Sequence, residues 1–462
     1  MPTASERLAA FTTGLTLDRV PREVGAKARL VMLDAVGIAL AASTMESGAM
    51  AIRLARQLAG RPESQVIGAS FKAAAASAVL ANGTAAHALD YDDTLEEGII
   101  HAGCVIAPTA FAVGEAVGAS GRAVLEAAVA GFEVMYKLGV AAPGRFHARG
   151  FHPTSVCAAF GAAAAAGRLY GLTAEQLVHA FGIAASQSSG VIEYLADGSW
   201  TKQFHPGWGA HGGIVAALLA REGFVAPRTA IDGARGFFAV FAGQEGVNLG
   251  RLEEIGGAWE LPKVMFKTYP CGSISHPYMD CALRIRQRHR PAPDEIREVV
   301  CRAHPAPVPR LWEPLADKQR PSTAYGAKFS LPYSIAVALV RGRAGLAEFE
   351  EPAIRDPEVL ALAARVRYVL DPSLEYPRHF SGHVSVVLRN GRVLEENQPH
   401  PRGGIENPIS PDEVERKFRA NAALAIPPEA AEATVERMAR LDELPDLSGL
   451  TSLWARQAAV AA

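Results

Sequence analysis

The chain carries its clearest fold signal in Arg22-Glu-Val-Gly-Ala-Lys-Ala-Arg-Leu-Val-Met-Leu-Asp-Ala-Val-Gly-Ile-Ala-Leu-Ala-Ala42. Apolar side chains recur in this stretch at close to helical spacing, at Val24, Ala28, Val31, Met32, Ala35, Val36 and Ile38. Similar stretches follow up to about residue 260, at Lys72–Ala88, Gly121–Lys137, Thr154–Leu169, Thr173–Ser186 and Gly209–Arg221. They are rich in Ala and Gly, whose small side chains let helices approach closely, so we expect dense helix-on-helix packing.

The character of the chain changes near Pro262. Runs rich in Val, with Ile or Tyr, predict strands at Glu295–Cys301 and Arg365–Leu370. Asn390-Gly391 is a strong hairpin signal between two further strands, His383–Leu388 and Arg392–Glu396. Helical patterns lie between the strands, at His276–Gln287, Leu331–Val340 and Asp356–Ala363, and a helical tail opens at Pro411.

These patterns predict a mainly α fold with an inserted α+β domain. We expect the N- and C-terminal segments, residues 1–262 and 404–462, to form one all-helical domain. Residues 263–403 are expected to form a smaller α+β lid domain. A crevice between two domains is a preferred place for a small-molecule site, so we expect the functional site there.

The composition restricts the partners and the compartment. The 462 residues carry a net charge of -2, without the basic face that a nucleic-acid partner requires, whereas a small anionic substrate needs only a few local cations. The longest apolar stretches are too short to span a membrane, and the N-terminus lacks the pattern of a signal peptide, so we expect a soluble protein. An odd number of cysteines without CxxC spacing argues against a disulfide framework and favours the reducing cytoplasm: Cys104, Cys157, Cys271, Cys281 and Cys301.

The most informative polar stretch is His87-Ala-Leu-Asp-Tyr-Asp-Asp-Thr94, followed by His101-Ala-Gly-Cys104. Burying so many ionisable groups is costly unless they are paired or used, so the stretch predicts the rim or floor of a site. Helix capping is the structural alternative, but a cap needs one such residue and not four. A metal site is not expected, because the spacing fits neither HExxH nor a standard calcium loop.

Four residues outside this stretch are further candidates. His152 precedes Pro153 and an Ala-rich helix whose N-terminal amides would suit an anion. Lys202 lies among Gly and Pro residues that predict tight turns before a helix, and Lys267 interrupts an apolar stretch where the two domains meet. A solvated ring for His152 and snorkelling surface chains for the lysines are the alternatives. For Tyr333, the alternative of a core aromatic with a satisfied hydroxyl is favoured on local grounds.

The chain resembles the MmgE/PrpD family, which includes 2-methylcitrate dehydratases, cis-aconitate decarboxylases and an iminodisuccinate epimerase. The resemblance spans nearly the whole chain and depends on five motifs in the same order. They are Asn82-Gly-Thr-Ala-Ala-His-Ala-Leu-Asp-Tyr-Asp-Asp-Thr94, Gly150-Phe-His-Pro-Thr154, Lys202 with the downstream run Gly207-Trp-Gly-Ala-His-Gly-Gly213, Lys267-Thr-Tyr-Pro-Cys271 with His276, and Ala327-Lys-Phe-Ser-Leu-Pro-Tyr333.

The resemblance implies a dimeric enzyme without a cofactor, whose pocket lies between the helical domain and the lid. It also implies the site residues, with Lys202 and Lys267 binding the substrate and the catalytic set comprising Asp90, Thr94, His101, His152 and Tyr333. His87, Asp92 and Asp93 are then interpreted as structural. The chain departs from the family pattern at Leu95 and Ala102, where relatives often carry His and Pro, and loop changes beside a site alter the choice of substrate first.

The expected function is a cofactor-independent lyase that acts on a small di- or tricarboxylic acid. Its proposed reaction is dehydration, which begins with proton abstraction next to a carboxylate. The two lysines would stabilise developing charge, an imidazole would move the proton, and Asp90 would fix the tautomer of a neighbouring His. Three alternatives stay open: an epimerase or isomerase that works by deprotonation and reprotonation, a decarboxylase, and an inactive relative that only binds a carboxylate.

Overall fold

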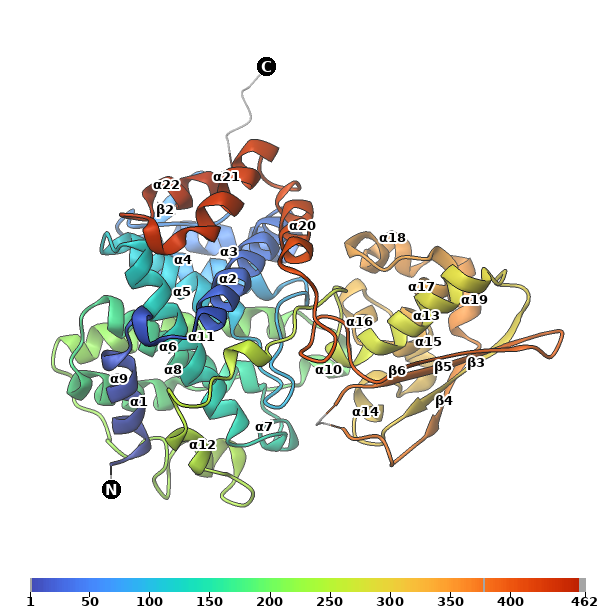
Figure 1. Ribbon diagram of the computed structural model, residues 1–462, viewed down its shortest axis with the longest axis horizontal. Helices are drawn as coiled ribbons and strands as arrows, with labels where there is room; N and C mark the ends of the chain where they lie inside the picture. Colours follow the sequence, from blue (N-terminus) through green and yellow to red (C-terminus); the bar gives the residue numbers. More distant parts are fainter. Residues whose placement is uncertain (1, 377–378, 457–462) are drawn as a thin grey trace.

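The chain folds into two bodies, each with its own hydrophobic core (Figure 1). This computed structural model describes residues 2–376 and 379–456. The larger core still includes Phe266, and the smaller core begins at Cys271, so residues 266–271 form the junction between a helical body and a lid. The fold is therefore mainly α with a smaller inserted α+β part, as the sequence predicts.

The first segment of the helical body consists mostly of helices. Their bounds are α1 Ala4–Gly14, α2 Arg22–Ser43, α3 Glu46–Gln57, α4 Ala75–His87, α5 Gly103–Ala116, α6 Gly121–Val140, α7 Arg145–Ala148, α8 Pro153–Leu169, α9 Ala174–Gln187, α10 Tyr194–Asp197, α11 Thr201–Arg221 and α12 Gly250–Glu253. One part differs from the prediction, because Lys72–Ala73 (β2) pairs with Ser64–Gln65 (β1) as a short antiparallel ladder. Helix α4 consequently begins at Ala75 and not at Lys72.

The helix α11 also begins earlier than the pattern predicts. It starts at Thr201, so Lys202 lies in its first turn and not in a loop before it. Pro206 lies inside the helix, where it removes one backbone donor and normally favours a break. Close packing against α4 and α8 on either side overrides this local preference.

The lid is a four-stranded sheet with helices packed on it, in the order β4-β3-β5-β6. Strand β3 (Ile296–Ala303) is parallel to β4 (Val366–Leu370) and antiparallel to β5 (Gly382–Leu388), which forms the expected hairpin with β6 (Val393–Gln398). Alternate residues of β5 are buried, as expected for a sheet with one packed face. The lid helices are α13 His276–His289, α14 Val308–Leu311, α15 Leu315–Gln319, α16 Ala324–Ala327, α17 Leu331–Arg341, α18 Glu351–Ile354 and α19 Pro357–Ala363.

The chain then returns to the helical body. Helices α20 (Pro411–Ala422), α21 (Pro428–Ala439) and α22 (Ser448–Thr451) place Phe418 and Trp454 in its core. Helix α20 packs along α2 and lies on the side of the body nearest the lid (Figure 1). The last helices are therefore part of the same packed unit as the first.

In the described ranges, no single helix is both long and apolar enough to cross a membrane. Among the described helices, the pair α2 and α3 is long and apolar enough when taken together, but the two helices are bent by 93° at the break between them.

Candidate active site

A cavity lies where the helical body, the junction and the lid meet. Its empty volume is about 640 Å³, which includes solvent space at the open mouth. The helical body contributes most of the polar lining, Lys267 comes from the junction, and the lid adds Ser273, Arg310 and Phe380. Six of the seven predicted site residues line this one cavity: Asp90, Thr94, His101, His152, Lys202 and Lys267.

Asp93 fixes the loop between α4 and α5 through hydrogen bonds to the start of α5 and to α6. Its Oδ1 accepts the backbone N–H of Gly103 at 2.9 Å, and its Oδ2 accepts the hydroxyl of Tyr136 at 3.0 Å. A Cβ on Gly103 would lie 2.1 Å from that Oδ1, so this contact requires glycine. Burial raises the pKa of Asp93 to about 7, helped by the negative charge of Asp92. Asp93 therefore has the structural role that we expected.

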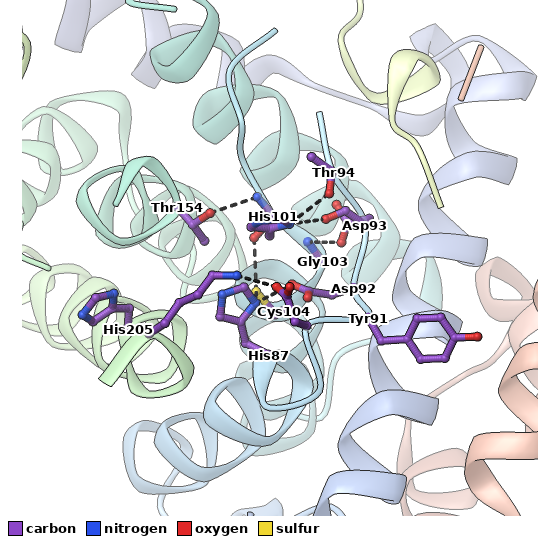
Figure 2. A network of polar contacts seen from close by, with 12 residues as sticks. His87, Tyr91, Asp92, Asp93, Thr94, His101, Gly103, Cys104, Thr154 and His205 are labelled. Atoms are coloured by element: carbon purple, nitrogen blue, oxygen red, sulfur yellow. Dashed lines mark hydrogen bonds and ion pairs between the residues drawn. The ribbon is translucent and has the colours of Figure 1, made fainter. Parts of the chain in front are cut away.

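A backbone carbonyl fixes the tautomer of His101 (Figure 2). Its Nδ1 lies 2.7 Å from the carbonyl oxygen of Asp93 and 3.1 Å from Oγ1 of Thr94. A carbonyl can only accept, so Nδ1 carries the hydrogen and Nε2 keeps its lone pair. Burial holds the pKa of His101 well below its usual value, and the ring is neutral. The backbone N–H of His101 donates to Oγ1 of Thr154 at 3.0 Å, which fixes the main chain as well.

Thr94 connects the acidic loop, residues 88–102 between α4 and α5, to Met265 just before the junction and to the lid. Its backbone forms a two-way pair with Met265, at 2.9 Å and 2.8 Å. Its hydroxyl lies 2.9 Å from Oγ of Ser273, which lines the cavity from the lid side. Thr94 therefore links His101 to the part of the chain that covers the site.

Asp90 forms an ion-pair cluster with the two predicted lysines. Its Oδ1 accepts from Nζ of Lys202 and, at 3.1 Å, from Nζ of Lys267, and all three residues are buried. Burial alone would raise the pKa of Asp90, but the two ammonium groups hold it well below its usual value. The expectation that Asp90 fixes a histidine tautomer is wrong, because Asp90 binds lysines and the backbone of Asp93 orients His101.

His152 stands on the opposite wall and contacts a second histidine. It is the residue directly before α8, and its Nδ1 lies 3.2 Å from Nδ1 of His205 on α11. Burial, followed by the neighbouring His205 and Lys202, holds the pKa of His152 well below its usual value. The cavity thus contains two neutral imidazoles, His101 and His152, whose ring centroids lie 6.2 Å apart.

His87, Asp92 and Cys104 lie together behind this wall. Their potential ligand atoms lie within 4.8 Å of one another, which makes the group a conceivable metal site. However, Nδ1 of His87 and Oδ2 of Asp92 are only 2.6 Å apart, the length of a strong hydrogen bond. Bonds of about 2.0–2.2 Å to a tetrahedral zinc ion would separate the same two atoms by about 3.4 Å. The contact therefore supports the structural interpretation of His87 and Asp92.

Tyr333 is not brought to the cavity. It lies fully buried in the lid core on α17, and its hydroxyl donates to the carbonyl oxygen of Glu348 at 2.6 Å. Tyr333 is not among the described residues that line the cavity. Tyr333 is therefore a core aromatic residue with a satisfied hydroxyl, which is the alternative that its local sequence favoured.

The sequence did not identify several lining residues. Arg310 belongs to the one-turn helix α14, and His147 belongs to the one-turn helix α7. Burial and the nearby charge of Arg310 lower the pKa of His147 to about 3, so it adds a further neutral imidazole. Neither residue lies in a motif or a periodic pattern, and folding alone brings the two short helices to the cavity.

Comparisons with known proteins agree with this architecture. A family model described as the MmgE/PrpD N-terminal domain matches residues 6–250, and one described as the MmgE/PrpD C-terminal domain matches residues 269–443. The chain is 27% identical over 468 residues to the cis-aconitate decarboxylase-like protein oryM of Aspergillus oryzae, which covers 96% of each chain. It is 27% identical to human cis-aconitate decarboxylase over 467 residues, covering 97% of this chain and 94% of that protein. It is 26% identical to 2-methylcitrate dehydratase of Cupriavidus necator over 302 residues, 60% of each chain.

Proposed function

The chain belongs to the MmgE/PrpD family, and from this premise we propose that it is a cofactor-independent lyase for a small di- or tricarboxylic acid. The relatives with which it aligns are named for a decarboxylase and a dehydratase, both of them lyases. The reaction that we propose first is dehydration, which begins with proton abstraction from the carbon next to a carboxylate.

The observation that carries this proposal is the state of His101. The ring is buried, neutral and held with Nδ1–H against a backbone carbonyl, so that its free lone pair is on Nε2. A base of this kind can accept a proton from carbon. Taking this proton makes His101 an imidazolium, which is the proposed donor to the leaving hydroxyl, while the neutral His152 on the opposite wall is proposed to orient the substrate.

The charges around the cavity favour a substrate with two carboxylates. The lining contains three cations, Lys202, Lys267 and Arg310, and one carboxylate, Asp90, and the histidines discussed above are neutral. Three positive charges less one negative charge leave two, which matches a dicarboxylate. When the proton leaves carbon, negative charge develops on the adjacent carboxylate, and fixed cations stabilise it most strongly in such a buried site.

Decarboxylation is the second candidate. It is favoured by the relatives that align over nearly their whole length, which are named as a cis-aconitate decarboxylase and a cis-aconitate decarboxylase-like protein, whereas the dehydratase aligns over 60%. Loss of carbon dioxide would produce the same type of carbanion, which then needs a proton from a protonated group in the cavity. An epimerase would use the same groups but return the proton to carbon, and an inactive relative would bind the carboxylate alone.

One experiment separates these outcomes. The protein is incubated in heavy water with a panel of di- and tricarboxylates, hydroxylated and unsaturated, and each reaction is followed by NMR. We expect net loss of water from a hydroxy acid. Release of carbon dioxide would assign a decarboxylase, deuterium wash-in without net elimination an epimerase, and no change with any acid would contradict the enzymatic proposal.

We also propose that the chain is a homodimer and that it works in the reducing cytoplasm. Support for the dimer comes from an aromatic stripe along the start of α11, where Trp200, Phe204 and Trp208 are 42%, 39% and 44% exposed. Contiguous apolar surface of this kind often marks a protein contact. Support for the compartment comes from the five cysteines, each of which is a buried free thiol.

A further inference from the structure

Three consecutive backbone carbonyls in the acidic loop each accept from a different lysine. Nζ of Lys328 lies 2.8 Å from the oxygen of Leu89, and Nζ of Lys267 lies 3.0 Å from the oxygen of Asp90. Nζ of Lys417 lies 2.7 Å from the oxygen of Tyr91. Charge-assisted hydrogen bonds of this type are stronger than neutral ones. The three lysines come from the lid, the junction and the returning helix α20.

The residue at the centre of this arrangement has an unusual backbone conformation. Asp90 has a φ of 52°, in the left-handed region that residues with a side chain seldom occupy. Such a conformation persists where the surroundings determine it, and it is common at functional sites. In this conformation Oδ1 of Asp90 meets both Lys202 and Lys267, while its buried Oδ2 has no partner among the described protein atoms.

Lys328 connects the lid to this loop. It follows α16, it is 6% exposed, and its Nζ also donates to the carbonyl oxygen of Pro270 at 3.0 Å. The same ammonium group lies 5.5 Å from the ring centroid of Phe349 in the lid. One lid side chain therefore binds the junction and the residue that precedes Asp90.

Lys417 connects the returning segment to the same loop. Its side chain is 7% exposed and forms an ion pair of 2.9 Å with Asp34 on α2. Its ammonium group also lies 3.8 Å from the ring centroid of Tyr91, whose carbonyl oxygen it binds. The position of the loop after Asp90 is therefore set by two helices of the body, α2 and α20.

We propose that Lys328 and Lys417, neither of which is among the described lining residues of the cavity, are positioning residues that hold Asp90 in its left-handed conformation and so place its carboxylate against Lys202 and Lys267. This inference rests on the proposed function for its kinetic consequences. It follows that the cluster of Asp90, Lys202 and Lys267 is complete only when the lid and helix α20 are packed against the body.

The protonation of Lys328 gives this arrangement a pH dependence. Burial lowers the pKa of Lys328 to about 8, and Lys267 and Lys202 act in the same direction, while Asp90 and Cys271 oppose it. Below that pH the ammonium group donates to the carbonyl of Leu89, and above it the charge is lost. Activity that needs Asp90 in place should therefore fall as the pH rises through about 8.

The test compares Lys328→Met and Lys417→Met with Lys137→Met in the full chain. Lys137 is also a buried lysine, but its Nζ pairs with Glu260 at 2.7 Å, and among the described residues it makes no hydrogen bond to the acidic loop. On the acid that the panel identifies, we expect kcat to fall by at least about tenfold in the two loop variants, because small misplacements of reacting groups are costly. We expect KM to change less, by about threefold at most, because Lys202, Lys267 and Arg310 remain in place to bind the anion. Lys137→Met should keep the kinetic constants of the parent.

Two further measurements keep the outcome decisive. Lys328→Arg keeps a permanent charge, so the activity lost near pH 8 should be retained in this variant. Amide hydrogen exchange over residues 88–95 should accelerate in both loop variants and not in Lys137→Met, whether or not a substrate is known.

Unchanged exchange overturns the positioning role, as does accelerated exchange with an unchanged kcat. If the parent turns over no acid, the proposed function fails and the exchange measurement still decides the inference. If Lys328→Met does not fold, Lys417→Met and Lys328→Arg decide it.

Discussion

Three aspartates lie within four residues of the acidic loop, and each has a different task. Asp92 holds the ring of His87, Asp93 binds the first backbone amide of α5, and Asp90 binds two lysines. Their environments move their pKa values in opposite directions, with Asp93 raised and Asp90 lowered. The same side chain therefore serves as a structural acceptor at one position and as a fixed anion at another.

The role of His101 is testable with His101→Gln. Glutamine can still hydrogen-bond to the loop but cannot act as a base near neutral pH, so we expect kcat to fall by about 10²–10⁴-fold. Steady-state kinetics and a thermal unfolding curve would measure activity and folding separately. His179→Gln is the control, because His179 bonds to the carbonyl of Ala226 away from the cavity. Full activity of His101→Gln would transfer the base role to another group.

The sequence predicted which residues gather at the site better than what each one does. Most of the predicted set could be found because its members lie in polar motifs between apolar helices. The partner of Asp90 on α11 is 112 positions away, and the partner of Asp93 on α6 is 43 positions away, so no local pattern reveals these pairs. Tyr333 shows the converse, since its motif is present but its hydroxyl is used inside the lid.

At the scale of elements, the crossing of α4 and α11 sets the width of the site. Helix α4 ends at His87, just before the acidic loop, and α11 carries Lys202 in its first turn. The two helices meet at Gly83 and Gly207, where a Cβ added to Gly207 would lie 2.2 Å from the carbonyl oxygen of Leu80. Backbone contact at this point fixes the distance between the acidic loop that follows α4 and Lys202 on α11.

We therefore expect Gly207→Ala to damage both stability and catalysis. The added methyl group must push the helices apart, which typically costs about 1–3 kcal/mol, and it displaces Lys202 from Asp90. Thermal unfolding and kcat measured on the same sample would test this. Gly14→Ala is the matched control, because no atom lies within 4 Å of its added Cβ and alanine favours a helix. Equal stability of the two variants would contradict the close crossing.

The elements that sequence patterns predicted poorly are those that tertiary packing determines. The strands, the hairpin and most helices could be predicted, because their periodicity and turn residues are local. The early start of α11 and the short ladder of β1 and β2 could not, because neighbouring elements stabilise them against local preference.

At the scale of the whole molecule, sequence order and packing do not coincide. The C-terminal family model covers residues 269–443, yet α20 and α21 within it pack in the core of the helical body. In the packing, α20 and α21 belong with the helices of the first segment. The lid is thus held to the body by two crossings of the chain.

The proposed dimer is testable at this scale with Trp208→Glu. A charge in the middle of the exposed stripe on α11 should weaken an apolar interface, so we expect the parent to be a dimer and the variant to shift toward monomer in light scattering. Leu424→Glu is the control, because Leu424 is 50% exposed on the returning segment. A parent that is monomeric across the concentration range would contradict the dimer, and a dimeric variant would place the interface elsewhere.

The return of the chain also sets an order for synthesis on the ribosome. Phe418 of α20 fills the space beside Gly37 of α2, and Lys417 is needed at the loop that follows Asp90. The first segment of the body is translated before the lid, but the acidic loop needs Lys417, which is made more than 300 positions later. The inserted lid has its own core and can fold during this interval, so the cover of the site can be in place before the site is complete.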